Sequence, residues 1–187
     1  MAERRQIKRY PIQLNARYLE GKGKDWKDCT VTDINNEGIR IIVSPHEKLH
    51  LDSTLQLEIV TPLKEKQIKA TCTLLWERET REKTHFKDFE EVTNIVEGGA
   101  RLEKIDSEDL RDILKIEEII DGIKCPKNFF CYRSGFNSLC KAESIGVASL
   151  VLCLEETPQE CNFSYFSDDR SFCKCPLRIY IAKELRK

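Results

Sequence analysis

Alternation of apolar and polar side chains constrains the fold of this chain more than any other feature. From Pro11 to about Ile105 the dominant period is two, and in the run 12–18, for example, apolar residues occupy every second position. Such alternation is typical of antiparallel strands that bury one face. Clusters of turn-forming residues divide the stretch at 21–23, 35–38 and 98–99. We therefore predict about six strands in a small closed or nearly closed barrel, which hides the strand edges.

The period changes after Ile105. Asp106 can cap a helix, apolar residues then recur at helical spacing as far as Ile120, and Gly122 suits the C-terminal cap. We therefore predict that one helix follows the barrel and completes its domain.

Composition divides the chain at the end of this predicted helix. Of nine cysteines, two lie in the first 124 residues and seven in the last 63. Residues 1–24 carry seven basic and two acidic side chains (+5), whereas residues 25–124 carry 15 basic and 23 acidic ones (−8). We predict a mainly β protein, with an antiparallel six-stranded barrel and its closing helix over residues 1–123 and a small α+β cysteine-rich module over residues 124–187.

Charge and hydropathy exclude several classes of protein. The 187-residue chain has a net charge of −1, so its composition does not argue for nucleic acid as a partner, and we expect none. The start of the chain is charged with no apolar run behind it, which argues against a signal peptide. The longest nearly apolar run, 146–154, is about half of a membrane span. We therefore expect a cytoplasmic protein without a membrane span.

Catalytic motifs are absent from the sequence. The chain has no Gly-x-Ser-x-Gly, no phosphate-binding P-loop and no His-Glu-x-x-His. The acidic residues are scattered over surface-like positions, which a solvated face explains. We therefore expect that the protein is not an enzyme.

Two short motifs point to a bound anion. Arg5 and Arg9 lie four positions apart ahead of the first predicted strand, and arginine presents a planar fork that grips phosphate or pairs with guanine. Asp33 and Asn35 alternate near a strand end, so they can face base edges and ribose from one side, and Gly38 permits close approach of a ligand. Each motif alone is common as a charge patch or a hairpin turn. Their order, spacing and barrel context make them more specific.

With these motifs, residues 3–121 resemble a PilZ domain. That family has Arg-x-x-x-Arg ahead of a six-stranded barrel and an Asp/Asn-x-Ser-x-x-Gly turn, and the run 99–103 resembles its closing strand. The resemblance implies binding of the bacterial second messenger cyclic di-GMP, with the arginines on guanine and phosphate of an often intercalated dimer. Asn35 replaces the family's serine; it keeps a donor and an acceptor but is longer and lacks the hydroxyl. The candidate ligand-binding residues are Arg4, Arg5, Arg9, Asp33, Asn35 and Gly38.

The basic arm, residues 1–10, suggests how binding could be transmitted. This arm is highly charged and has no apolar period before Ile12, so we expect it to be mobile without ligand. A bound dianion could order it and thereby expose or cover a surface for a protein partner that the sequence does not identify.

The cysteine-rich tail offers ligands for a soft metal. In a reducing compartment disulfides are the weaker interpretation, and zinc or an iron–sulfur cluster commonly takes four thiolates. The stretch 172–175 is typical of a strand, which would put Cys173 and Cys175 on one face. Cys125 and Cys131 would then close the other end of the module on the same site. The candidate metal ligands are Cys125, Cys131, Cys173 and Cys175.

Other features of the tail favour a structural role. It contains no Cys-x-x-Cys and no histidine, and cysteine is a common small buried hydrophobe. Cys140 and Cys153 lie in apolar stretches, 136–141 and 148–155, which we predict to be helical and part of a core. Metal binding and simple packing both stay open.

Three function classes follow from these patterns. The leading hypothesis is a cyclic di-GMP receptor whose tail docks a partner or stabilises the domain. The second is a metal or redox sensor that uses the tail, with or without nucleotide binding. The third is a nucleic-acid-binding or structural module that uses the basic arm, against which the acidic middle region argues.

Overall fold

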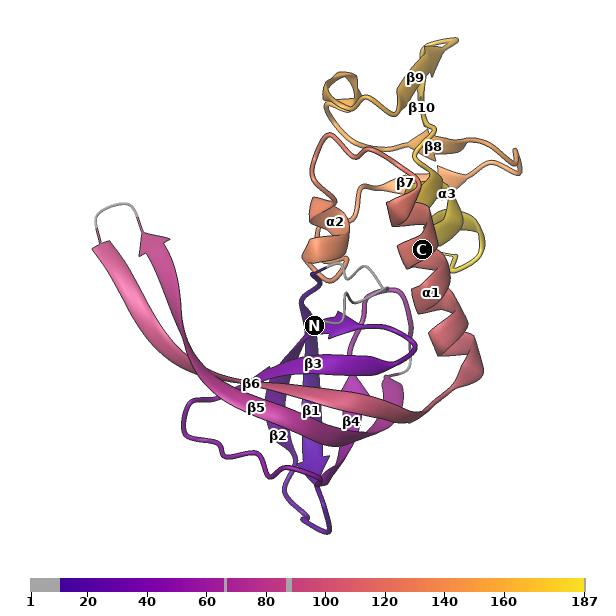
Figure 1. Ribbon diagram of the computed structural model, residues 1–187. Helices are drawn as coiled ribbons and strands as arrows, with labels where there is room; N and C mark the ends of the chain where they lie inside the picture. Colours follow the sequence, from indigo (N-terminus) through magenta and orange to yellow (C-terminus); the bar gives the residue numbers. More distant parts are fainter. Residues whose placement is uncertain (1–10, 66, 87–88, 187) are drawn as a thin grey trace, which may run out of the picture. The chain divides into compact units, whose positions relative to one another are not determined.

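The computed structural model describes residues 11–65, 67–86 and 89–186 (Figure 1). The chain forms two compact units, the first from residues 1–61 and 66–113 and the second from residues 62–65 and 114–187. The division falls inside a helix, and the domain boundary after residue 123 stays a prediction. Among the described residues, no helix has the length and apolar character needed to cross a membrane.

A closed antiparallel barrel forms the first unit, as the alternation predicts. Its strands run in the order β1-β2-β3-β6-β5-β4, and β1 also pairs with β4 to close the ring (Figure 1). The strands are β1 Leu14–Glu20, β2 Lys27–Ile34, β3 Gly38–Val43, β4 Thr54–Ile59, β5 Ile68–Phe86 and β6 Phe89–Ile105.

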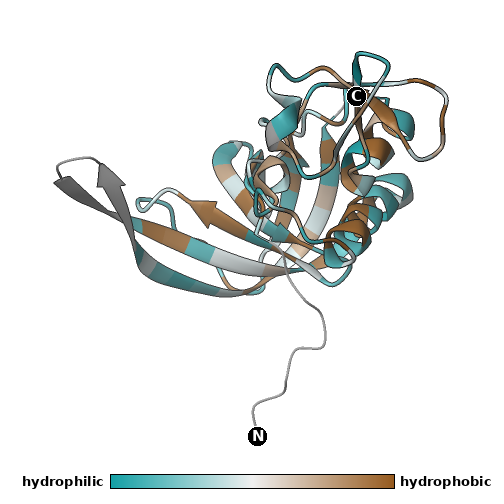
Figure 2. Ribbon diagram, turned by 90° about the horizontal axis from the view of Figure 1, so that it is seen from above, coloured by the Kyte–Doolittle hydropathy of each residue, from teal (hydrophilic) through white to brown (hydrophobic). Residues whose placement is uncertain are grey.

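The barrel interior is built from every second residue of its strands. In β1, Leu14, Ala16 and Tyr18 are buried, whereas the residues between them are exposed. Figure 2 shows the same mixture of hydrophobic and hydrophilic positions along the barrel strands. Burial of one face of each strand therefore supplies the core of this unit.

Gly98 and Gly99 lie inside β6, so the prediction of a turn at this pair is wrong. The strands β5 and β6 form one long ribbon that is paired from Ala70–Ile105 out to Phe86–Phe89. A Cβ on Gly99 would lie 2.2 Å from the indole of Trp76, and one on Gly98 would lie 2.7 Å from Leu49. These glycines make room for neighbouring side chains rather than for a reversal of the chain.

The helix α1, Ser107–Asp121, follows β6 as predicted. The Oδ1 atom of Asp106 accepts hydrogen bonds from the backbone N–H groups of Glu108 and Asp109, at 2.8 and 3.4 Å. Asp106 is therefore the N-cap, and Gly122 follows the last helical residue.

The second unit contains a small sheet and short helices. Its sheet has the order β7-β8-β10-β9, and Val151, Cys173 and Ala182 form a hydrophobic cluster beside it. The elements are α2 Phe130–Arg133, β7 Ala142–Ser144, β8 Val151–Cys153, the 3₁₀ helix η1 Pro158–Glu160, β9 Ser164–Ser167, β10 Arg170–Cys173 and α3 Pro176–Lys183.

Three local predictions for this unit are wrong. The stretch 136–141 is irregular and Cys153 ends the strand β8, so neither Cys140 nor Cys153 is helical. The predicted strand over 172–175 stops at Cys173, because Pro176 begins α3 and makes Cys175 its N-cap. Short apolar runs fit a strand, a buried loop and a helix alike, so the sequence pattern could not decide between them.

Candidate functional site

Asn35 fixes the turn between β2 and β3. Its side chain is buried, and its Oδ1 accepts hydrogen bonds from the backbone N–H groups of Glu37 at 2.9 Å and Gly38 at 3.0 Å. The backbone N–H of Asn35 donates to the carbonyl of Gly38 at 3.0 Å. The turn therefore uses the acceptor of the Asn35 side chain and leaves the amide NH₂ as the group that can meet a ligand.

The amide nitrogen of Asn35 is a buried donor that the described part of the chain does not satisfy. Within residues 11–65, 67–86 and 89–186, its Nδ2 has no hydrogen-bond partner. Buried donors in native proteins are nearly always paired, because an unpaired one costs about 1–3 kcal/mol. An acceptor atom of a bound ligand would satisfy this nitrogen.

Asp33 lies beside Arg40 at the same end of the barrel. The two residues are cross-strand partners on β2 and β3, and an Oδ2–Nη2 distance of 3.9 Å joins them. Asp33 is buried, while the Arg40 side chain keeps 30% of its area exposed. The pair therefore offers a carboxylate and a guanidinium next to the Asn35 turn.

Sequence reasoning missed Arg40, although a signal was present. In a hairpin whose turn is 35–38, Ile34 must face Ile39 and Asp33 must face Arg40, as the structure has them. The Nε of Arg40 also has no hydrogen-bond partner among the described residues. Arg40 is therefore a further candidate for contact with an anion.

Gly38 is required by the packing of the barrel. A Cβ at this position would lie 2.6 Å from the carbonyl oxygen of Ala100 on β6. The adjacent Glu37 carbonyl accepts a hydrogen bond from Leu102 N–H at 3.0 Å. The close approach at Gly38 is thus to strand β6, and its contact with a ligand stays a prediction.

The predicted arginine clamp lies outside the described residues. Arg4, Arg5 and Arg9 all fall within residues 1–10, which the structure does not describe. Their part in binding therefore stays a prediction.

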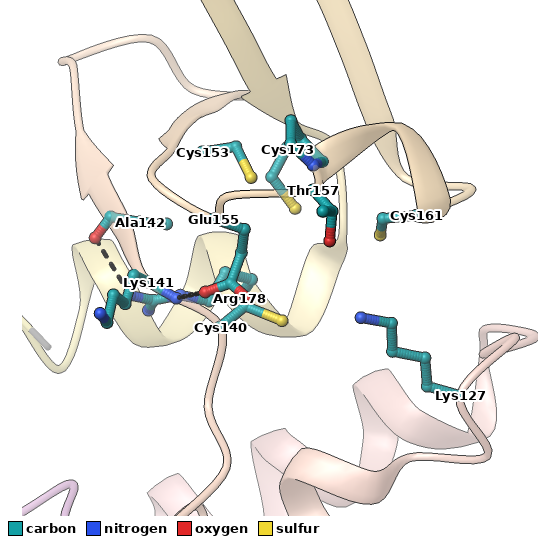
Figure 3. A pocket seen from close by; sticks show the side chains of 11 residues that line it. Lys127, Cys140, Lys141, Ala142, Cys153, Glu155, Thr157, Cys161, Cys173 and Arg178 are labelled. Carbon is teal, nitrogen blue, oxygen red and sulfur yellow. Dashed lines mark hydrogen bonds between the residues drawn. The ribbon is translucent and has the colours of Figure 1, made fainter.

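All seven cysteines of the tail line two adjoining cavities in the second unit. The larger cavity, of about 350 Å³, and the smaller one, of about 30 Å³, share several lining residues. All nine cysteines of the protein are free thiols. Those lining the larger cavity are Cys125, Cys131, Cys140, Cys161, Cys173 and Cys175. Those lining the smaller cavity, which Figure 3 shows, are Cys140, Cys153, Cys161 and Cys173.

The structure therefore brings the four predicted metal ligands to one cavity, together with two further thiols. Cys140 and Cys161 were missed because nothing in their local sequence marks them as neighbours of Cys131 or Cys175. Among the described residues, no three His, Cys, Asp or Glu side chains form a group that could hold a metal ion as they stand. Ligation by these thiols stays a prediction.

Burial raises the pKa of several of these thiols. It raises the pKa of Cys131 to about 11 and that of Cys173 to about 12. Burial also raises the pKa of Cys175, against the opposing hydrogen bonds from the backbone N–H groups of Leu177 and Arg178. A nucleophilic cysteine needs a lowered pKa, so these raised values argue against covalent catalysis. Ligation would require a metal to displace the thiol protons.

Positive charge lies at the same cavities. Arg178 is buried, lines both cavities and donates from Nη2 to the carbonyl oxygen of Ala142 at 3.0 Å. Lys127 lines both cavities as well (Figure 3). The two cations would complement a negatively charged group bound among the thiols.

Comparison with known proteins identifies the barrel. A family model, the PilZ domain, matches residues 3–115. A structure of the Bacillus subtilis inhibitor of motility (MotI/DgrA) is 17% identical with a TM-score of 0.47, over 65% of this chain and 54% of that one. The PilZ domain of YcgR from Escherichia coli, with c-di-GMP, is 12% identical with a TM-score of 0.46, over 65% of this chain and 100% of that one. This chain thus spans about half the length of MotI. No curated protein matches it.

Proposed function

Because the chain belongs to the PilZ domain family, we propose that it is a cytoplasmic receptor for cyclic di-GMP and not an enzyme. The observation that carries this proposal is the Asn35 turn at one end of a closed barrel. There a buried amide nitrogen has no partner among the described residues and lies in the family's ligand-binding turn. A ligand with acceptor atoms would satisfy that donor.

Cyclic di-GMP has the groups that these residues can recognise. Its phosphates and the O6 and N7 atoms of guanine are acceptors for the Asn35 amide and for the Arg40 guanidinium. The carboxylate of Asp33 can accept hydrogen bonds from the guanine edge or from ribose hydroxyls. The turn therefore supplies both donors and an acceptor to one ligand.

The start of β1 brings the chain to this end of the barrel. The backbone N–H of Ile12 donates to the carbonyl of Thr32, the neighbour of Asp33, at 3.2 Å. Arg9 precedes Ile12 by three residues, and three extended residues span at most about 11 Å. Arg9 is thus within reach of the turn, which supports a clamp formed by Arg5 and Arg9, with Arg4 as a further cation.

Ordering of the basic arm would transmit the signal. Phosphate and guanine would draw the arginines of residues 1–10 onto the barrel, and the position of the arm would then differ between the free and the bound protein. A protein partner that contacts the arm or the surface beneath it would distinguish the two states. The basic character of the arm, with four basic side chains and one acidic one in residues 1–10, supports this role.

Isothermal titration calorimetry with cyclic di-GMP tests the clamp. The unmodified chain is expected to bind, and Arg9→Ala is expected to weaken binding at least about tenfold, the loss typical of a charge-assisted contact. Arg78→Ala is the matched control, because Arg78 pairs with Glu97 on the β5–β6 ribbon. Equal affinity of Arg9→Ala and the unmodified chain would refute the assignment of Arg9.

A second candidate function, metal or redox sensing, is favoured by one specific observation. The seven thiols of the tail come from separate segments and line adjoining cavities. Zinc and iron–sulfur clusters are the centres that thiolates bind. Cys125, Cys131, Cys173 and Cys175 are the ligand set that the sequence suggests, and metal analysis of the purified chain tests it.

A further inference from the structure

We propose that the larger cavity of the second unit binds an iron–sulfur cluster rather than a single zinc ion. The inference deepens the second candidate function above and is independent of cyclic di-GMP binding. The proposed ligands are Cys125, Cys131 and Cys175, with a fourth thiolate from Cys140 or Cys161.

The first argument is convergence. The cavity of about 350 Å³ receives thiols from α2, from β10, from the irregular segments before β7 and between β8 and β9, and from the N-cap of α3. Cys125 and Cys175, which are 50 positions apart in the sequence, line the same cavity. If these thiols served only to pack a small core, that core would fill the space, since protein interiors pack closely.

The second argument concerns the separation of the sulfurs. A zinc ion with Zn–S bonds of about 2.3 Å draws its tetrahedral sulfurs to about 3.8 Å from one another. The described residues contain no group of three His, Cys, Asp or Glu side chains that could hold a single metal ion. An iron–sulfur core carries its own irons and sulfides between the cysteines, so its ligands stand farther apart around a cavity. Six thiols around a cavity of about 350 Å³ leave room for such a core.

The third argument selects the ligands. The thiols of Cys125 and Cys175 each interact electrostatically with that of Cys131, and those of Cys125 and Cys175 also interact with each other. All three thiols line the larger cavity and not the smaller one. The Cys140 thiol interacts in the same way with Cys131, and the Cys161 thiol with Cys175. Both residues line the larger cavity, so either can supply the fourth thiolate.

Cys173 and Cys153 are better explained by packing. Cys173 is buried in the hydrophobic cluster with Val151 and Ala182, and its Sγ accepts a hydrogen bond from the Cys175 N–H at 3.4 Å. Cys153 packs against the same cluster and lines only the smaller cavity. Cys175 also packs against this cluster but lines only the larger cavity, whereas the buried Cys173 lines both cavities, so the proposed ligand set omits Cys173.

The surroundings of the cavity suit an anionic centre. The backbone N–H groups of Leu177 and Arg178, at the start of α3, point to the sulfur of Cys175, where the helix dipole favours negative charge. The buried Arg178 and the Lys127 side chain add positive charge on the cavity wall. A cluster held by four thiolates carries net negative charge, which these groups offset.

Metal and sulfide analysis of the full chain, purified without oxygen, tests the inference. After reconstitution with ferric iron, sulfide and dithiothreitol, which reduces part of the iron, we expect about four iron and four sulfide per chain, a brown colour and bleaching by dithionite. Stoichiometric zinc that iron and sulfide cannot replace would overturn the inference, and so would a chain that retains neither metal. Cyclic di-GMP affinity, measured on the same sample, reports the barrel separately.

Single cysteine variants test the ligand set. Cys125→Ser, Cys131→Ser and Cys175→Ser should each lower bound iron at least about tenfold, as should one of Cys140→Ser and Cys161→Ser. Cys153→Ser is the matched control and should keep its iron. Far-ultraviolet circular dichroism checks that each variant is folded. Retention of the cluster by the first three folded variants, or an equal loss in Cys153→Ser, would contradict the assignment.

Discussion

Asp33 on β2 faces Arg40 on β3, and 3.9 Å separates the Oδ2 atom of the carboxylate from the Nη2 atom of the guanidinium. The pair lies two residues from the turn in which Asn35 is buried. A carboxylate, a guanidinium and an amide NH₂ therefore occupy one end of the barrel. This combination can bind the guanine, ribose and phosphate groups of a nucleotide.

Loss of Arg40 should weaken nucleotide binding. Arg40→Ala removes the cation that faces Asp33 and is itself a candidate phosphate contact, so we expect the Kd for cyclic di-GMP to rise about five- to tenfold, equivalent to about 1 kcal/mol. Calorimetry measures the change, with Arg78→Ala as a control on the β5–β6 ribbon. An unchanged Kd for Arg40→Ala would exclude Arg40 from the site.

Asn35 should affect both stability and binding. In Asn35→Ala the N–H groups of Glu37 and Gly38 lose their acceptor, which should lower the free energy of unfolding by about 1–3 kcal/mol. Asn35→Ser keeps a short acceptor and should lose less. Urea unfolding compares the two variants. Equal losses in alanine and serine would show that the side-chain oxygen does not hold the turn.

Gly38→Ala should destabilise the barrel. Its Cβ would meet the Ala100 carbonyl oxygen at 2.6 Å, and forcing the strands apart should lower the free energy of unfolding by about 1–3 kcal/mol. Gly122→Ala is the control, because a Cβ there would meet ordinary contacts of 3.7 Å. A stability of Gly38→Ala as high as that of Gly122→Ala would argue against the packing role.

Stability should fall in acid through Glu58. The hydrogen bond from Arg17 Nε to Glu58 Oε2, at 2.7 Å, is the main cause that lowers the pKa of this carboxyl. A lowered pKa stabilises the folded state above the ordinary pKa of glutamate, about 4.3, and this contribution disappears as the pH falls through the folded-state value.

Glu58→Gln isolates this contribution. The variant should lose at most about 1 kcal/mol at neutral pH, the range for partly exposed ion pairs. Its free energy of unfolding should also change less between pH 7 and pH 3 than that of the unmodified chain. Urea unfolding across this range measures both, and parallel pH profiles for the two proteins would rule Glu58 out as the source.

The strands, the barrel and the closing helix could be predicted from sequence because their signals are local. Alternation marks the buried face of β1, and Asp106 marks the start of α1. The turn predicted at Gly98 and Gly99 was wrong because glycine occurs both in turns and at close contacts. Only the position of the Trp76 side chain, against Gly99, distinguishes the two roles.

The candidate sites depended more on tertiary structure. The hairpin register places Arg40 opposite Asp33, so that residue could have been found from the turn alone. The presence of Cys140 and Cys161 at the cavity of Cys131 and Cys175 could not, since these residues meet only after the small sheet and α3 have formed. Their local sequence, without Cys-x-x-Cys, carries no sign of that meeting.

Calorimetric titration of the unmodified chain with cyclic di-GMP, alongside cyclic di-AMP, tests the central claim most directly. The account predicts saturable binding of cyclic di-GMP and no measurable binding of cyclic di-AMP, because the arginines and the Asn35 turn are assigned to guanine as well as to phosphate. Absence of cyclic di-GMP binding, or equal binding of the two dinucleotides, would contradict it.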